Sequence, residues 1–233
     1  MFDLKNRTYV VLEFATADDI TNHKIGRLKF CTDNIVEVAA VKIENGEIKK
    51  HFSTFVAVEG CDPQLDEFQD GNFSSLGVTE PHLIGAPDFK EVAERVYDFA
   101  KASVIIVRDN FSWRSDPYTL FKEKAASYGF IFNNPVLIME RIYAAMNLRK
   151  AVENSGIEFE KISLLQLAAM MGYESKSWKE TFEEYDIFTF TEYVAHFVRY
   201  DSLTWALGFA QLFINLVEEE TEKLENVDEK SPF

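Results

Sequence analysis

Two apolar segments joined by Asn45-Gly46 constrain the fold more than any other feature of this sequence. Asn-Gly between strand-like segments is the strongest short signal for a β-hairpin. Residues 35–42 and 48–58 flank the turn and are rich in β-branched and aromatic side chains, as strands are. Residues 9–16 form a third run of this kind earlier in the chain. Together these segments predict an antiparallel meander of three strands.

Helices and short strands are expected to alternate after the meander. Apolar residues at helical spacing predict a helix over residues 89–102, and a short apolar run predicts a strand over residues 103–107. Asp116-Pro117 marks the start of another helix, and residues 191–217 hold a long helical pattern. This order predicts an α/β fold with a mixed central β-sheet and flanking helices.

The length of 233 residues suits one α/β domain. We expect a single domain over residues 1–217 and an acidic, solvated tail over residues 218–233. Cys31 and Cys61 form no CxxC motif, which argues against a disulfide framework or a structural zinc site and favours a reducing, cytoplasmic setting. No stretch approaches the ~20 apolar residues of a membrane span, so no membrane partner is expected.

The formal net charge of −15 bears on the choice of partner. Attraction to a phosphate backbone needs Lys and Arg, so strong non-specific binding to nucleic acid is disfavoured. A nucleic-acid site bridged by metal ions remains compatible with this charge. Bound cations can be the largest local charges of such a site, and the carboxylates that hold them add to the acidity.

Glu13 is the first candidate for a functional residue. It lies near the end of the strand expected over residues 9–16, where a carboxylate costs free energy unless it binds a cation or a hydrogen-bond donor. Side chains alternate between the faces of a strand, so Glu13 and Ala15 point the same way. The competing interpretation is a strand-end glutamate that simply reaches solvent.

Three further candidates are Asp116, His196 and Asp201, which stand at the starts or ends of expected elements. Carboxylates that converge on one place repel unless cations neutralise them, and oxygen ligands suit Mg²⁺ or Mn²⁺. A two-metal site could activate a water and stabilise the leaving oxygen of a phosphodiester, with His196 as general base. Plainer roles are also open: a helix cap for Asp116, a half-buried helix histidine for His196 and a solvated acid for Asp201.

The order of these parts resembles the DnaQ-like (DEDDh) 3′–5′ exonuclease superfamily, which has a ribonuclease H-like fold. The resemblance runs from about Tyr9 to Leu216. The segments that carry it are strand 9–16, the meander over 35–47, Phe52-Ser53-Thr54-Phe55, the turn-like Leu76-Gly77-Val78-Thr79, residues 86–89, residues 164–168 with Gly172, and His196-Phe197-Val198-Arg199-Tyr200-Asp201. The last of these matches the His-four-residues-Asp signature of the superfamily.

The resemblance implies that Glu13, Asp116 and Asp201 hold two Mg²⁺ or Mn²⁺ ions and that His196 takes the proton from the attacking water. The first superfamily motif is Asp-x-Glu, whereas this chain has Glu13-Phe14-Ala15. The first acid is therefore longer by one methylene, and the second acid is absent.

The second superfamily motif, His-Asn-x-x-Phe-Asp, is also altered. Residues 108–113 follow the strand at this place, and Asp116 aligns only with a short insertion, so Asp109 is its rival. Asp18, Asp19 and Glu37 are candidates to replace the ligand missing at Ala15. A further alternative is that Ala15 was introduced to trap an inactive state, and the sequence does not exclude it.

Two functions follow from the resemblance. The first is a metal-dependent 3′–5′ exonuclease that acts on single-stranded DNA or RNA 3′ ends, with weak or absent activity because of Ala15. The second is a catalytically inactive exonuclease-fold module that binds nucleic acid or a protein partner. The missing acid and the net charge favour the second function, whereas the His196 and Asp201 pair favours the first. The sequence does not give DNA or RNA preference, oligomeric state or pathway.

Overall fold

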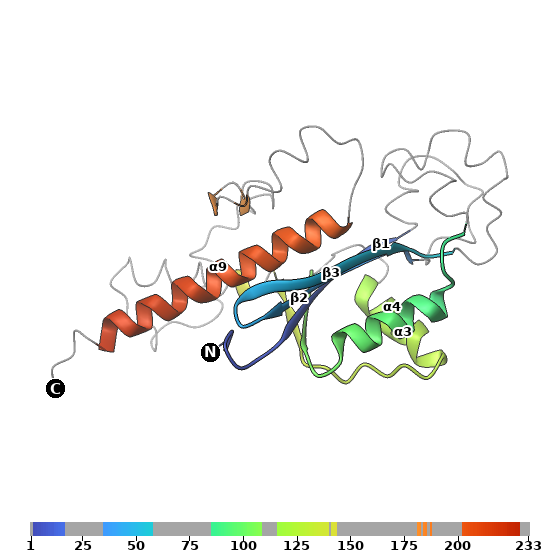
Figure 1. The fold of residues 1–233 in the computed structure, drawn as a ribbon, viewed down its shortest axis with the longest axis horizontal. Coiled ribbons are helices and arrows are strands. Elements are labelled where there is room, and N and C mark those ends of the chain that lie inside the picture. Colours follow the sequence, from blue (N-terminus) through green and yellow to red (C-terminus); the bar gives the residue numbers. More distant parts are fainter. Residues whose placement is uncertain are drawn as a thin grey trace, which may run out of the picture.

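The computed structural model describes residues 2–16, 35–57, 85–108, 116–139, 141–143, 181–182, 184–185, 187 and 202–228 (Figure 1). Its centre is a five-stranded sheet in the order β3-β2-β1-β4-β5. The strands are β1 (Tyr9–Thr16), β2 (Ile35–Glu44), β3 (Glu47–Phe55), β4 (Val104–Val107) and β5 (Val136–Ile138). The helices are α3 (Phe89–Ala100), α4 (Pro117–Ser127) and α9 (Ser202–Asp228).

The sheet is mixed, as the sequence predicts. β1 is its middle strand and pairs antiparallel with β2 and parallel with β4. β2 and β3 form an antiparallel hairpin, so the expected meander is confirmed. Its turn has positive φ at both Asn45 (54°) and Gly46 (76°), which is the geometry that favours Asn-Gly in a two-residue hairpin loop.

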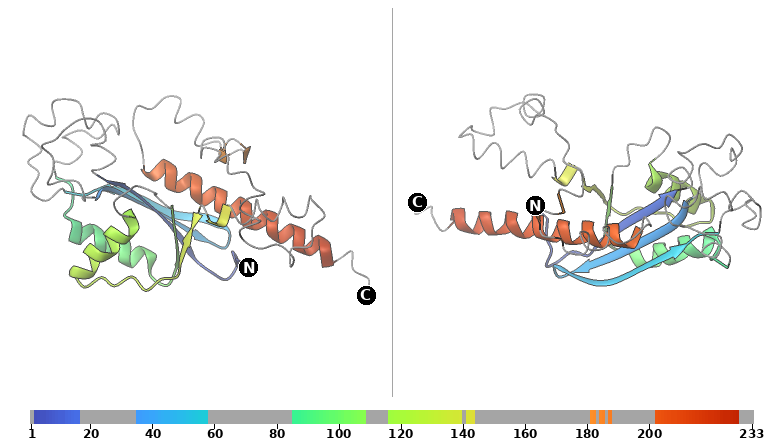
Figure 2. Two further views of the ribbon diagram at one scale, coloured as in Figure 1. Left: turned by 180° about the vertical axis from the view of Figure 1, so that it is seen from behind. Right: turned by 90° about the horizontal axis from the view of Figure 1, so that it is seen from above.

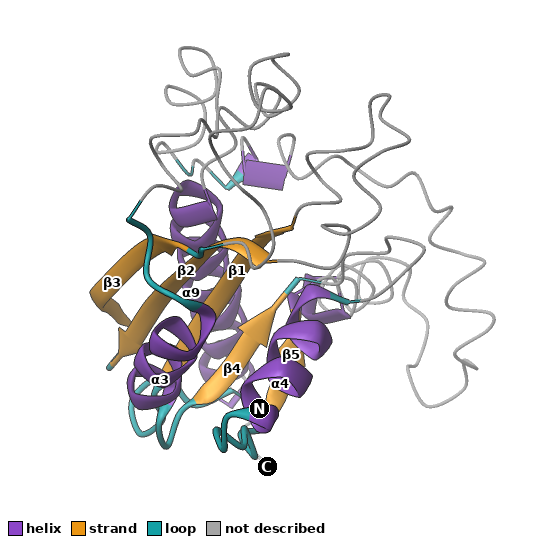
Figure 3. Cartoon of the chain, turned by 90° about the vertical axis from the view of Figure 1, so that its right-hand side faces the viewer, coloured by secondary structure: helices purple, strands orange, loops and turns teal. Residues whose placement is uncertain are grey.

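Helices cover both faces of the sheet. Figure 3 shows α3 and α4 on one face and α9 on the other, and the two views of Figure 2 agree. Because side chains alternate along a strand, β1 supplies Val10, Leu12 and Phe14 to the core under α3 and α4. The same strand supplies Tyr9 and Val11 to the core under α9. The expected fold class is therefore confirmed.

α9 continues beyond the apolar pattern that predicted it. That pattern ends at Val217, whereas the helix runs to Asp228. The acidic residues after 217 are compatible with helix because glutamate has a good helix propensity. The division into a domain over 1–217 and a tail over 218–233 stays a prediction. Within the described residues, α9 included, no helix combines the length and apolar content needed to span a bilayer.

Candidate functional site

Glu13 is a buried acid at the centre of the sheet. Only 2% of the residue is exposed, and it lies on the face of β1 that α9 covers. The Nε atom of Arg108 lies 3.0 Å from its Oε1 atom, which makes an ion pair. The backbone N–H of Phe14 donates to its Oε2 atom at 3.3 Å. Both carboxylate oxygens of Glu13 thus contact protein groups.

The register of the parallel strands explains how Arg108 reaches Glu13. Leu12 of β1 is paired with Val107 of β4, so the next residues of the two strands, Glu13 and Arg108, lie level with each other. The guanidinium also lies over two aromatic rings of α9, 5.2 Å from the centroid of Trp205 and 6.0 Å from that of Phe209. These are distances at which cation–π attraction acts.

A second buried acid stands beside Ala15. The Cα atom of Ala15 is paired with that of Glu37 on β2, and both residues are nearly inaccessible, at 1% and 2% exposure. Directly opposite residues of an antiparallel pair share one face, so Glu37 lies on the α9 face as well. The Ser202 hydroxyl of α9 donates to Glu37 Oε2 at 3.1 Å. Glu37, a candidate to replace the missing ligand, therefore lies at this end of the sheet.

Asp116 is the N-cap of α4. Its Oδ1 accepts from the Tyr118 N–H at 3.3 Å, and its Oδ2 accepts from the N–H and hydroxyl of Thr119 at 3.1 and 2.8 Å. These bonds satisfy amide donors that the first turn of a helix leaves without partners. The expected capping role of Asp116 is thus present in the structure, with both of its oxygens engaged.

Tyr118 follows this cap and faces the core under α3 and α4. Burial raises the pKa of its hydroxyl to about 12, and the negative charge of Asp116 adds to the rise. Within the described residues this buried hydroxyl has no hydrogen-bond partner. Tyr118 is therefore protonated at neutral pH.

The other candidates, His196, Asp201, Asp109, Asp18 and Asp19, lie outside the described residues. Whether they join Glu13 stays a prediction. Two partners of the buried acids were not among the residues predicted from sequence: Arg108 for Glu13 and Ser202 for Glu37. One signal was available for Arg108. It is a cation directly after an apolar strand, and the carboxyl ends of neighbouring parallel strands meet at one edge of a sheet.

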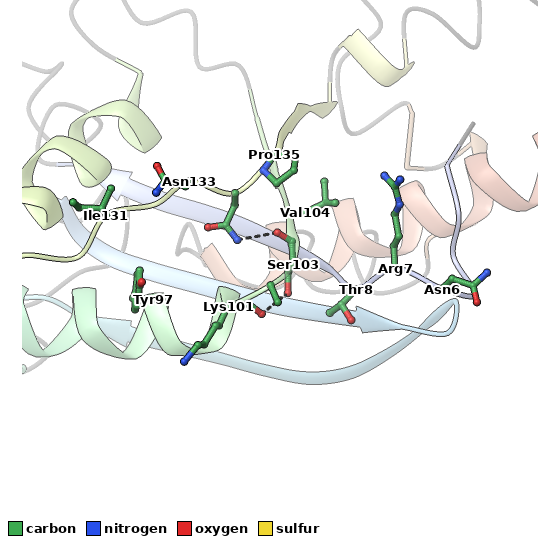
Figure 4. A pocket seen from close by; sticks show the side chains of 12 residues that line it. Asn6, Arg7, Thr8, Tyr97, Lys101, Ser103, Val104, Ile131, Asn133 and Pro135 are labelled. Carbon is green, nitrogen blue, oxygen red and sulfur yellow. Dashed lines mark hydrogen bonds between the residues drawn. The ribbon is translucent and has the colours of Figure 1, made fainter.

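A pocket of about 650 Å³ lies at the opposite end of the sheet from Glu13 (Figure 4). It opens beside the residues that precede β1 and β4, and Arg7 and Lys101 are its charged lining residues. Asn134 fixes the neighbouring loop by donating to the carbonyls of Ala100 and Ser103 at 2.9 and 2.8 Å. None of the candidate acids lines it, so this pocket is separate from the Glu13 site.

The fold and sequence were compared with known proteins. Residues 27–113 match the family model described as RNase_T, exonuclease. This stretch of the chain is therefore similar to the exonuclease family. The matched segment contains β2, β3, α3 and β4, but it begins after Glu13 and ends before Asp116. The family match therefore covers much of the scaffold and leaves the roles of these two acids as predictions.

One curated relative and two solved structures extend the comparison. The PolC-type DNA polymerase III of Caldanaerobacter subterraneus subsp. tengcongensis is 32% identical over 106 residues, which are 45% of this chain and 7% of that polymerase. Cell-death related nuclease 4 (CRN-4) superposes with a TM-score of 0.53 at 14% identity, over 91% of this chain and 64% of that one.

The second structure is a 3′-exonuclease solved for its 3′-end specific recognition of histone mRNA stem-loop. It has a TM-score of 0.51 at 15% identity, and the match covers 95% of this chain and 84% of that one. At such identities the two structures establish the fold and nothing further. The expected ribonuclease H-like exonuclease fold is confirmed.

Exonucleases of this superfamily typically depend on two metal ions. Such ions need carboxylate lone pairs that face a common space. In this chain Glu13 pairs with Arg108, Asp116 caps α4, and Ala15 has no side-chain oxygen. The described residues hold no cluster of three or more acidic, His or Cys side chains suited to a metal ion. Among the described residues, oxygens of Glu13 and Asp116 contact protein groups. The ligand roles of Glu13, Asp116 and Asp201 stay predictions.

Proposed function

We propose that this exonuclease domain binds the 3′ ends of single-stranded DNA or RNA and hydrolyses them slowly or not at all. Ala15 is the observation that carries the proposal. It is buried on the α9 face, two residues after Glu13. The resemblance to the superfamily implies that the second acid of the first motif would stand at this position. Removing one carboxylate from a two-metal site should impair both metal occupancy and geometry, and the hydrolysis rate depends on both.

The end of the sheet that carries Glu13 and Glu37 supports a binding role because contacts within the chain hold these polar groups in place. Glu13 and Glu37 are on neighbouring strands, and their partners come from the end of β4 and the start of α9. The 3′-end substrate class is carried over from the exonuclease family, as is an ion requirement, with Mn²⁺ favoured over Mg²⁺ for any residual hydrolysis. A cytoplasmic location also stays a prediction.

Binding and hydrolysis should be measured separately. Binding is read from the fluorescence anisotropy of short labelled single strands that end in a 3′-hydroxyl or a 3′-phosphate. Hydrolysis is read from the shortening of the same strands in Mg²⁺, Mn²⁺ or EDTA. We expect binding that favours the 3′-hydroxyl strand, no shortening in Mg²⁺, and at most slow shortening in Mn²⁺.

Ala15→Glu tests whether the missing acid limits hydrolysis, and Ala15→Gln is its matched control because it adds the same length without the charge. We expect Ala15→Glu to shorten the strands faster in Mn²⁺ than the unaltered chain does, and Ala15→Gln to bring no such increase. Rapid Mg²⁺-dependent hydrolysis by the unaltered chain would contradict the proposal. No gain from Ala15→Glu would leave the binding role alone standing.

A protein partner is the second candidate. The net charge of −15 favours it, because an acidic surface attracts basic protein segments and repels phosphate backbones. Failure to bind any single strand at low salt would replace the nucleic-acid proposal with this one.

A further inference from the structure

The structure assigns to Arg108 the role of a resident cation, whose guanidinium fills the place beside Glu13 Oε1 that a divalent metal ion would take. The acid at the middle of the sheet is then neutralised from within the chain. The inference does not rest on the proposed function, because it concerns the charge balance of the site whether or not a strand binds there.

The first support is the position of the charge. Arg108 Nε lies 3.0 Å from Glu13 Oε1, and the register of β1 with β4 holds the two residues level. A Mg²⁺ ion bound to Oε1 would lie about 2.0–2.1 Å from that oxygen and therefore close to the guanidinium. Two cations cannot share that space without strong repulsion in a poorly solvated site. Metal binding at Oε1 of Glu13 therefore requires Arg108 to move away.

The second support is that the guanidinium is held from both sides. Glu13 lies against it on the sheet, and Trp205 and Phe209 of α9 lie under it at 5.2 and 6.0 Å. A planar, weakly hydrated guanidinium stacks on aromatic rings better than a lysine ammonium does. The arginine charge is also permanent, because its pKa lies above 12. α9 thus contributes two aromatic rings that hold the Arg108 guanidinium beside the sheet.

The third support is the neighbouring acid. Glu37 is as deeply buried as Glu13, and it accepts a hydrogen bond from within the chain, from the Ser202 hydroxyl at 3.1 Å. Burying a carboxylate costs free energy unless it is paired or hydrogen-bonded. Both acids on this face meet that condition through groups of the chain itself.

The test measures metal binding directly, with Mn²⁺ as the probe. Free Mn²⁺ is followed by electron paramagnetic resonance, and the Tm is measured in Mn²⁺ and in EDTA. The full chain is compared with Arg108→Gln and with Arg95→Gln. Arg95 is a matched control because it also lies over an aromatic ring, Phe52 at 4.2 Å, but on α3.

We expect the unaltered chain and Arg95→Gln to leave Mn²⁺ free and to show the same Tm in Mn²⁺ and EDTA. Arg108→Gln removes the guanidinium charge beside Glu13, so the Tm of this variant should fall in EDTA and rise again in Mn²⁺, with Mn²⁺ now bound. Adding Glu13→Gln to Arg108→Gln should abolish that Mn²⁺ binding. Folding of Arg108→Gln only in Mn²⁺ would be the strongest form of this result.

Mn²⁺ binding by the unaltered chain that Glu13→Gln abolishes would overturn the inference. So would an Arg108→Gln chain that folds and still leaves Mn²⁺ free. If Arg108→Gln folds neither in Mn²⁺ nor in EDTA, Arg108→Lys is the deciding variant. A folded Arg108→Lys chain whose Tm does not change with Mn²⁺ supports the resident cation. A folded Arg108→Lys chain that binds Mn²⁺ through Glu13 overturns the inference. This Mn²⁺ experiment does not depend on nucleic-acid binding. Failure of the proposed function would show instead in the anisotropy and strand-shortening assays.

Discussion

The two faces of β1 bury different chemistry. On the face under α3 and α4, the side chains from Val10 to Phe14 are all apolar. On the face under α9, the alternate series also begins apolar but reaches Glu13, which pairs with Arg108. One strand therefore carries a plain hydrophobic core on one side and a charge pair at the end of a core on the other.

This difference separates stability from specificity. Apolar burial is non-directional and scales with area, so both cores should stabilise the fold in the same way. A buried ion pair adds little net stability over an apolar pair, but it is costly when one partner is removed. The charged end of the α9 face therefore restricts which residues can stand there.

The largest expected effect compares the two cores directly. Phe121→Ala removes a fully buried ring that packs on Phe14, Phe89 and Phe132, and Phe213→Ala removes one that packs on Tyr9. Each should lower the free energy of unfolding by about 3–5 kcal/mol, measured by urea denaturation. A loss below about 1 kcal/mol for either variant would mean that its face is not a packed core.

The second effect isolates the charge pair. Glu13→Gln or Arg108→Gln alone should cost about 3 kcal/mol, the lower end for a buried pair because Arg108 keeps 17% of its side chain exposed. The double variant should lose clearly less than the sum, because neither charge is then left without its partner. Additive losses in the urea midpoints would show that the two side chains do not interact.

The third effect concerns the cap of α4. Asp116→Ala should cost about 1 kcal/mol of unfolding free energy, whereas Asp116→Asn should cost only a few tenths because asparagine is an equally good N-cap. The amide keeps the acceptor for the helix N-terminus and removes the negative charge. Equal losses for the two variants, measured in EDTA, would show that the charge itself matters and not the cap.

The smallest effect concerns Tyr118, whose buried hydroxyl has no partner among the described residues. Its pKa of about 12 lies above the ordinary value of 10, so the folded state keeps this proton more tightly than the unfolded chain does. Its contribution to stability is therefore full below pH 10 and is lost as the pH rises towards 12. Tyr118→Phe should reduce the loss of unfolding free energy between pH 10 and pH 12 and should leave the unfolding free energy at neutral pH unchanged. Urea denaturation at neutral pH and above pH 10 measures both. An unchanged slope would place the high-pH loss elsewhere.

Local patterns made the scaffold predictable. The Asn45-Gly46 turn, the apolar run of β1 and the Asp116-Pro117 helix start each depend on a few adjacent residues, and each is present as expected. The end of α9 was harder because the residues after Val217 carry no apolar periodicity, yet remain helical to Asp228.

The site was less predictable because its contacts join distant segments. Glu13 and Arg108 meet only through the register of β1 with β4, and Glu37 faces Ala15 only through the register of β1 with β2. A one-residue slip would turn either side chain to the other face, and no short motif fixes such a register. Sequence reasoning therefore found the buried acid but not its partner.

The mixed pairing of β1 also sets an order of assembly. Its antiparallel neighbour β2 and the next strand β3 follow closely in sequence, whereas β4 and α9 arrive from far along the chain. Nearby segments close first because loop-closure entropy rises with separation. Glu13 should stay hydrated in an early meander and lose its water only when Arg108 and α9 dock together. Dehydration of this carboxylate is then a late folding step that requires the correct topology. Pulse-labelled hydrogen exchange would show the β1–β2 amides protected before those of β4.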